Sequence, residues 1–178
     1  MLKRVQYFGL VRQHRDRVFN FSLYFLRNRE DAEDVTQNVF IKFWERWDEI
    51  DRFKALPWLM RVAHHECVDL VRHYKNRIHS GPASGDGFWG TIGLSDPEHP
   101  QGSLEKNEEK RLLLDALAEL PERTQSMILM HYFEDMKFED VAKVFGMETN
   151  AVKVQVHRAR TVLRTVLEKK YPELAGVS

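Results

Sequence analysis

The sequence predicts an all-α protein with two small helical domains joined by a flexible linker, the second domain containing a helix-turn-helix. Apolar residues recur at three- and four-residue steps in both halves of the chain, as they do on the buried face of an amphipathic helix. Between residues 78 and 102 glycine and proline recur while no helical or strand period continues, which is typical of a linker. We therefore expect domains at residues 1–76 and 105–178, with the linker at residues 77–104.

Two helices are expected at the start of the first domain. An apolar stripe over residues 7–25 predicts the first of them. Asn28 and the acidic residues that follow it are suited to cap a second helix and to complement its dipole. The apolar stripe of this second helix covers residues 35–47.

A third helix is expected at the end of the first domain. Residues 48–57 are typical of a loop. Pro57 suits the first turn of the helix that follows, because a proline there loses no helical hydrogen bond. This helix should run from about residue 58 to residue 75, with Trp58 as a core anchor.

The last third of the chain contains the parts of a helix-turn-helix. Helices are expected over residues 104–120 and 123–133, followed by a short helix that ends at Gly146 and a longer basic one over residues 151–160. Gly146 suits the left-handed backbone that ends a helix, and Thr149 or Asn150 is expected to cap the next one. Such a basic helix is either a solvated face or a major-groove reader, and the preceding helix, turn and cap favour DNA binding.

Composition excludes several classes of protein. The 178 residues carry no net charge, so any nucleic-acid binding must depend on local patches. Cys67 is the only cysteine, so no disulfide can form within the chain. The N-terminus lacks the apolar core of a signal peptide, and no apolar run approaches the roughly 18 residues of a membrane span. We expect a cytoplasmic protein with no membrane insertion.

Two sets of motifs resemble the extracytoplasmic-function (ECF) group of bacterial RNA polymerase sigma factors, in the sigma-70 family. Residues 116–122, 138–142 and 151–163 are similar to sigma region 4, which reads the minus-thirty-five promoter element. Residues 31–40 are similar to region 2.2, and residues 58–72 to regions 2.3 and 2.4. The resemblance covers nearly the whole chain outside the linker and the extreme tail, and it implies that residues 1–76 are region 2 and residues 105–178 are region 4.

The resemblance implies that this chain is a promoter-specificity subunit without its own catalytic site or cofactor. It would dock on core RNA polymerase through Asp34, Gln37, Asn38 and Ile41. It would recognise and help melt the minus-ten element, holding an unstacked base, through Arg52, Phe53, Lys54, His65, Arg72, His73 and Lys75. It would read the minus-thirty-five element through Thr149, Asn150, Lys153, Val154, His157 and Arg158.

Three positions depart from the family pattern. His65 stands where asparagine is common, Gln125 where arginine often follows the Leu-Pro-Glu segment, and Ala151 where threonine is common. The first two changes put familiar promoter contacts in doubt, so base preference can differ here.

The third helix also contains residue types that bind metals. His64, His65 and Cys67 are close in sequence, and imidazole and thiolate are good zinc ligands. Adjacent histidines point to different faces of a helix, however, and the second histidine of the zinc-protease motif is replaced by Asp69. We therefore expect no metal site, and Cys67 should be a small core residue.

Two other functions remain as alternatives. The main one is a helix-turn-helix transcriptional regulator that does not act as a sigma subunit, and the region 2.2 motif at residues 31–40 disfavours it. The weaker one is a metal-dependent hydrolase that uses the histidine-rich third helix. Relatives are often held inactive by an anti-sigma factor, but no residue here identifies such a partner.

Overall fold

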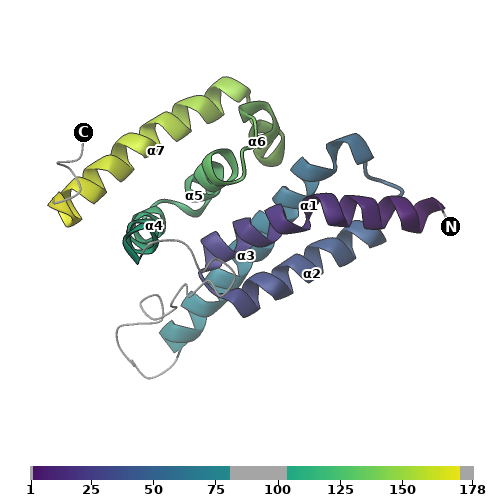
Figure 1. Ribbon diagram of the computed structural model, residues 1–178, viewed down its shortest axis with the longest axis horizontal. Helices are drawn as coiled ribbons and strands as arrows, with labels where there is room; N and C mark the ends of the chain where they lie inside the picture. The colour runs from purple at the N-terminus through teal and green to yellow at the C-terminus, as the bar shows by residue number, and fades with distance from the viewer. Residues whose placement is uncertain (1, 81–103, 173–178) are drawn as a thin grey trace.

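The computed structural model describes residues 2–80 and 104–172, and these form a two-lobed helical protein. The first lobe contains the helices α1 (Leu2–Leu26), α2 (Arg29–Glu45) and α3 (Ala55–Ser80), with a 3-10 turn, η1 (Arg52–Lys54), before α3. The second lobe contains α4 (Leu104–Leu117), α5 (Glu122–Ile128), the π-helical turn η2 (Leu129–Phe133), α6 (Phe138–Phe145) and α7 (Thr149–Lys170). The described residues contain no strand, and the predicted all-α class is confirmed (Figure 1).

The turn between α1 and α2 is short because two residues have special roles in it. Arg27 takes a left-handed backbone conformation, with φ 56°. Asn28 then accepts a hydrogen bond from the backbone N–H of Asp31 at 3.0 Å, which satisfies one of the free donors at the start of α2. The predicted cap at Asn28 is therefore confirmed.

Helix α3 is longer than the sequence predicted. It begins at Ala55 rather than Trp58, so the expected loop through Pro57 is wrong at its last three residues. Pro57 still lies in the first turn, where its missing N–H costs no hydrogen bond. The helix continues to Ser80, inside the predicted linker, and residues 81–103 lie outside the described residues.

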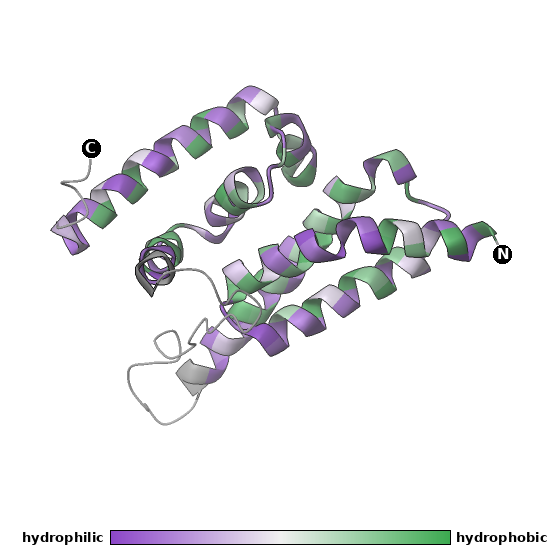
Figure 2. Ribbon diagram, viewed as in Figure 1, coloured by the Kyte–Doolittle hydropathy of each residue, from purple (hydrophilic) through white to green (hydrophobic). Residues whose placement is uncertain are grey.

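The apolar stripes meet in one contiguous core that extends through both lobes. In the first lobe Phe21, Phe43 and Leu59 are fully buried where α1, α2 and α3 face one another. In the second lobe Leu117, Met127 and Val152 are fully buried between α4, α5 and α7. Figure 2 shows the apolar stripes running along the helices between polar faces.

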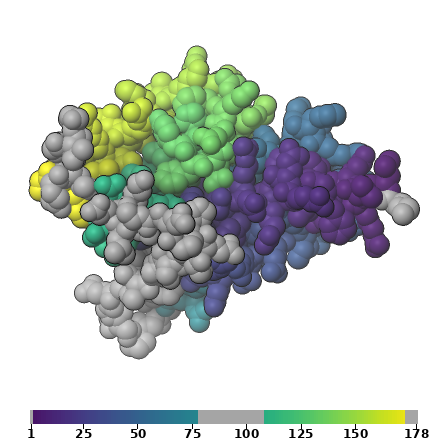
Figure 3. Space-filling view, in the orientation of Figure 1, coloured from purple at the N-terminus to yellow at the C-terminus, as the bar shows by residue number. Residues whose placement is uncertain are grey.

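The two lobes pack directly against each other, which the sequence analysis did not predict. Helix α3 contacts α6, and α1 contacts α5 and η2. The ring of Tyr24 on α1 lies 5.2 Å from that of Phe133 on η2, and Arg27 forms an ion pair with Asp115 on α4. Figure 3 shows the two lobes in contact along this boundary.

Candidate nucleic-acid interface

Helices α6 and α7 form a helix-turn-helix whose geometry follows from a few residues. Gly146 has φ 61° and ψ 41°, the left-handed conformation expected at the end of α6. The N–H of Met147 donates to the carbonyl of Ala142 at 3.0 Å, which closes the turn. Val141 and Ala142 on α6 and Val152 on α7 are buried, and they hold the two helices together.

The outward face of α7 carries most of the predicted minus-thirty-five residues. Asn150, Lys153, Val154, His157 and Arg158 are exposed, whereas Thr149 is half-buried. Val154, an apolar side chain on this otherwise polar face, is 47% exposed. The face therefore combines cations with an apolar group that can meet a thymine methyl.

The expected cap of α7 is wrong. Thr149 is the first helical residue, and Glu148 occupies the cap position without a side-chain hydrogen bond to the helix. The helix begins at Thr149 itself, so Thr149 and Asn150 lie in its first turn.

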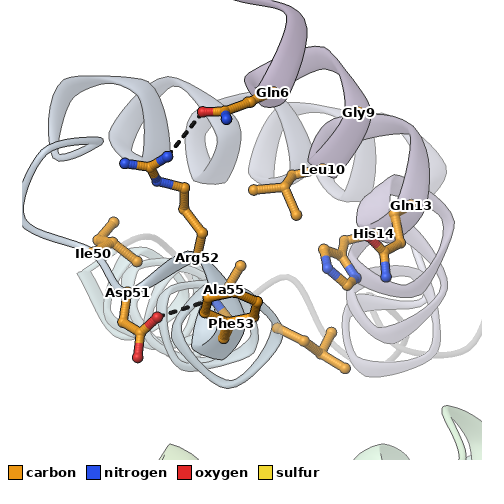
Figure 4. Close-up of a pocket in the computed structure, with 11 residues that line it drawn as sticks. Gln6, Gly9, Leu10, Gln13, His14, Ile50, Asp51, Arg52, Phe53 and Ala55 are labelled. Carbon is orange, nitrogen blue, oxygen red and sulfur yellow. Dashed lines mark hydrogen bonds between the residues drawn. The ribbon is translucent and has the colours of Figure 1, made fainter. Parts of the chain in front are cut away.

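Two of the three predicted minus-ten residues before α3, Arg52 and Phe53, line an open cavity. Asp51 accepts a hydrogen bond from the N–H of Phe53 at 3.0 Å and so orders η1. The ring of Phe53 is fully exposed. Arg52 Nη1 donates to the side-chain amide oxygen Oε1 of Gln6 on α1 at 2.8 Å, at the rim of a cavity of about 870 Å³ between α1 and the start of α3 (Figure 4).

Sequence reasoning missed the α1 side of this cavity. Its wall includes Gln6, Gln13 and His14, together with the apolar Leu10 and Leu56. The position of His14 in the apolar stripe of α1 indicated only a core residue. The side chains of this wall become one surface only when α1 packs beside η1.

His14 in the cavity wall has a buried ring nitrogen, Nδ1, without a hydrogen-bond partner among the described residues. The residue is 8% exposed. Burial, and secondarily the nearby Arg17 guanidinium, lower the pKa of its imidazole. The ring is therefore a neutral donor-acceptor group beside an open cavity.

The remaining predicted minus-ten residues lie further along α3 and are exposed; they are His65, Arg72, His73 and Lys75. From Lys54 to Arg72 the helix rises about 27 Å at 1.5 Å per residue. The structure therefore does not bring all seven residues into one patch, and a strand touching both ends would span about eight nucleotides at 3.4 Å each.

Arg72 has a partner that the sequence did not indicate. Its Nη2 lies 3.5 Å from the Glu122 carboxylate of α5, and Lys75 lies 3.4 Å from the same carboxylate. Arg72 therefore forms an ion pair with the second lobe.

The four predicted polymerase-docking residues are all exposed on one face of α2: Asp34, Gln37, Asn38 and Ile41. They follow the three- and four-residue spacing of a single helix face. Ile41 is 54% exposed, and Trp44, 38% exposed, lies one turn further on. This face combines an apolar centre with polar neighbours, which suits a protein interface.

His64 of α3 packs against the second lobe. His64 Nδ1 lies 2.8 Å from the Ser126 hydroxyl, and burial lowers the pKa of His64 to about 4. His65 is exposed on another face, and Cys67 is fully buried, which raises the pKa of its thiol. Within residues 2–80 and 104–172, three or more histidine, cysteine or acidic side chains nowhere cluster as metal ligands would.

Gln125, one of the departures from the family pattern, is 5% exposed in α5. Its side chain therefore belongs to the packed interior of the second lobe. None of the described helices is both long enough and apolar enough to cross a membrane.

Comparison with known proteins agrees with this architecture. The family model described as Sigma-70 region 2 matches residues 10–77, and that described as Sigma-70, region 4 matches residues 110–163. The chain is 26% identical over 95% of its length to the probable RNA polymerase sigma factor RfaY of Xanthomonas campestris pv. campestris. It is 28% identical over 93% of its length to the ECF RNA polymerase sigma factor SigE of Mycolicibacterium smegmatis. It spans 42% and 63% of these two relatives, respectively.

The fold also resembles that of a solved structure, the sigma factor RpoE in complex with the anti-sigma factor NepR from Bartonella quintana. The TM-score is 0.64 at 18% identity, over 90% of this chain and 95% of that one. Fold and helix-turn-helix thus define a two-lobed helical protein of the DNA-binding class. The two family models, which match one lobe each and together cover well over half of the residues, show that the chain belongs to the sigma-70 family of sigma factors. Its similarity to ECF sigma factors, at 28% identity for SigE, supports the expected ECF group.

Proposed function

We propose that this protein is a promoter-specificity subunit that binds core RNA polymerase and directs promoter-specific initiation of DNA-templated transcription. The observation that carries the proposal is that one chain combines an exposed helix-turn-helix face on α7 with a separate lobe matched to sigma region 2. A regulator that only binds duplex DNA needs the first feature and not the second. The polymerase performs the chemistry, and this chain supplies no catalytic group.

The proposed division of labour follows the two lobes. Region 2 is proposed to end with α3 at Ser80 rather than at residue 76, and region 4 to begin with α4 at Leu104, with the linker between them. The exposed face of α2 docks on the polymerase, and α7 places Lys153, Val154 and Arg158 against the minus-thirty-five element. Two tethered contacts on one promoter raise affinity beyond either contact alone.

The cavity between α1 and η1 is the proposed site for the unstacked base of the minus-ten element. Apolar walls at Leu10 and Leu56 suit the faces of a base, and the exposed ring of Phe53 is available for stacking. The amides of Gln6 and Gln13 and the imidazole of His14 can read a base edge by hydrogen bonds.

Regulation by a binding partner is also proposed. The RpoE structure with a similar fold contains the anti-sigma factor NepR. An anti-sigma factor for this chain would have to compete for the same exposed faces on α2, α3 or α7. The proposed location is the cytoplasm, where the polymerase and its promoters are.

Reconstitution tests the main proposal. The purified chain is added to bacterial core polymerase and a library of random promoter sequences, and the transcripts are sequenced. We expect start sites that share two spaced motifs and that vanish when the chain is omitted. Specific binding to duplex DNA without polymerase, and no initiation with it, would favour the helix-turn-helix regulator instead.

A further inference from the structure

A cleft lies where α3, α5 and the end of α6 meet, away from the cavity proposed above for an unstacked base. It measures about 410 Å³, a size typical of small-ligand sites. Four of the residues that line it can carry positive charge, and three belong to the end of α6; they are Arg61, His64, His65 and Arg123, then Val144, Phe145 and Gly146. None of these lining residues is acidic, so the cleft suits an anion.

Two arginines reach this cleft from different lobes. Arg61 on α3 donates from its Nε to the carbonyl of Val144 at 2.8 Å, and from its Nη2 to the carbonyl of Lys143. Arg123 on α5 donates from its Nη2 to the carbonyl of Phe145 at 3.2 Å. These carbonyls belong to the last turn of α6, where they have no partner within the helix. The hydrogen bonds therefore hold two guanidinium groups at one helix end.

The two guanidinium groups carry more charge than this helix end requires. The carbonyls at a helix C-terminus amount to about half a negative charge, whereas Arg61 and Arg123 carry one full positive charge each. A guanidinium also has five N–H donors, and the three hydrogen bonds to α6 leave most of the donors of the two side chains available to a ligand. Capping of α6 thus accounts for the positions of the arginines and leaves a surplus of positive charge.

The titration of His64 reflects these positive surroundings. Burial is the main cause that lowers its pKa to about 4, and the nearby charges of His65, Arg123 and Arg72 lower it further. Glu122 acts in the opposite direction, but its carboxylate is itself paired with Arg72 at 3.5 Å. The acidic group that acts on His64 therefore does not cancel the positive charge of the cleft.

We propose that this cleft binds a chain of linked phosphates, as carried by a nucleoside triphosphate or by inorganic polyphosphate, between the guanidinium groups of Arg61 and Arg123. The planar guanidinium fork matches two phosphate oxygens at once. Linked phosphates bring several negative charges together, as the two arginines bring positive ones, whereas a DNA strand carries one charge per phosphate along its length. The site requires neither promoter DNA nor polymerase, so its test is independent of the proposed function.

Calorimetric titration of the purified full-length chain with sodium tripolyphosphate tests the site. At about 0.15 M salt, where exposed charges are screened, we expect saturable binding of one anion per chain. The dissociation constant should lie below about 1 mM, an affinity that a few charge-assisted hydrogen bonds supply. The same anion should raise the melting temperature by mass action. Absence of saturable binding below about 1 mM would overturn the proposal and leave the arginines as caps of α6.

A matched pair of substitutions separates the cleft from general surface charge. Arg123 lies 5.5 Å from the centre of the Phe145 ring, and Arg160, in the same lobe but outside the cleft, lies 5.8 Å from that of Tyr132. Arg123→Gln should weaken tripolyphosphate binding roughly 10- to 100-fold, since charge-assisted hydrogen bonds are lost. Arg160→Gln removes the same charge and should change the affinity little. Equal losses in the two variants would mean that only net charge matters, which would overturn the proposed site.

Two further variants keep the test decisive. Arg61→Gln should weaken binding as much as Arg123→Gln, and unchanged affinity would exclude a site built from both arginines. Arg123→Lys keeps the charge but loses the planar fork, so its affinity should fall between those of the wild type and Arg123→Gln. Circular dichroism reports whether each variant is folded, and Arg123→Lys decides the question if Arg123→Gln does not fold.

The choice of anion distinguishes the two sources of linked phosphates. Tighter binding of ATP or GTP than of tripolyphosphate would identify a nucleotide site, and equal binding a polyphosphate site; adenosine alone should not bind. A short single-stranded DNA without terminal phosphates is the competing ligand. If it binds with the same dependence on Arg123 while tripolyphosphate does not bind, the cleft holds a DNA backbone and the proposal is wrong.

Discussion

Lys153 and Arg158 are the residues whose proposed role is most directly testable, because both are exposed on α7. Replacing either by alanine should weaken binding of the polymerase holoenzyme to its promoter by roughly 1–3 kcal/mol if the side chain reads a base edge. A phosphate contact would instead weaken all sequences alike and lower the salt dependence. Lys169→Ala, at the far end of the same helix, is the control. Filter binding to promoters with altered minus-thirty-five sequences distinguishes these results, and unchanged binding would refute the assignment.

The role proposed for His14 is a hydrogen bond from its unpartnered Nδ1 to a base in the cavity. Replacing it by leucine removes one donor-acceptor group beside the cavity, worth about 0.5–1.5 kcal/mol for a neutral hydrogen bond. We expect up to about a tenfold loss of discrimination among single-stranded oligonucleotides that differ at one base. The His14→Gln variant, which keeps polar atoms, should retain more of it. If stability rises and base preference is unchanged, His14 is only a core residue.

Glu134 is a buried carboxyl group at the end of η2, and burial raises its pKa to about 8. Between the ordinary value of 4.5 and about 8 the native protein holds a proton that the unfolded chain has lost. Stability from this group is therefore present at low pH and falls as pH rises through that window, by at most about 1.4 kcal/mol per pH unit.

Replacing Glu134 by glutamine keeps the shape of the side chain and removes its ionisable group. Urea unfolding from pH 5 to pH 8 should show a flatter pH dependence and greater stability at pH 8 than in the wild type. The exposed Glu139→Gln is the control and should leave the slope unchanged. An identical slope in wild type and Glu134→Gln would contradict the prediction.

At the scale of the element, the turn between α6 and α7 depends on a backbone conformation. Gly146 has φ 61°, and a Cβ there would meet no atom within 4 Å, so Gly146→Ala is strained without a clash. The expected cost is about 1–2 kcal/mol of unfolding free energy. Gly9→Ala lies inside α1 and also meets no atom within 4 Å, so it should instead stabilise by roughly 0.5–1 kcal/mol. Thermal unfolding of both variants tests the opposite signs.

Element boundaries illustrate where local signals suffice and where they do not. Asn28 and Gly146 act through hydrogen bonds or dihedral angles within a few residues of themselves, and both were predicted correctly. The starts of α3 and α7 were placed too late, because Pro57 is compatible with several positions in a first turn and because Thr149 lies in the first turn although threonine is favoured at the cap. Composition alone does not choose between such positions.

At the scale of the whole molecule, the α2 face and the α7 face should be separable functions. Ile41→Glu places a charge at the centre of the proposed docking surface on an exposed residue, so folding should change by less than about 0.5 kcal/mol. We expect loss of core-polymerase binding in co-purification. Val162→Glu, at a similarly exposed apolar residue on α7, should retain it. Equal binding by both variants would exclude Ile41 from the docking surface.

The sequence by itself determined the helical class, the helix-turn-helix and the resemblance to a sigma factor, because periodicity, caps and motifs act over short stretches of chain. It could also place Asp34, Gln37, Asn38 and Ile41 on one face, since helix geometry fixes their spacing. Only the tertiary structure joined Gln6, Gln13 and His14 to η1 in one cavity, because those residues lie some forty positions apart along the chain. It alone set Arg61 against α6 and Glu122 against Arg72. Contacts between distant segments depend on how complete helices pack, and no local pattern encodes that choice.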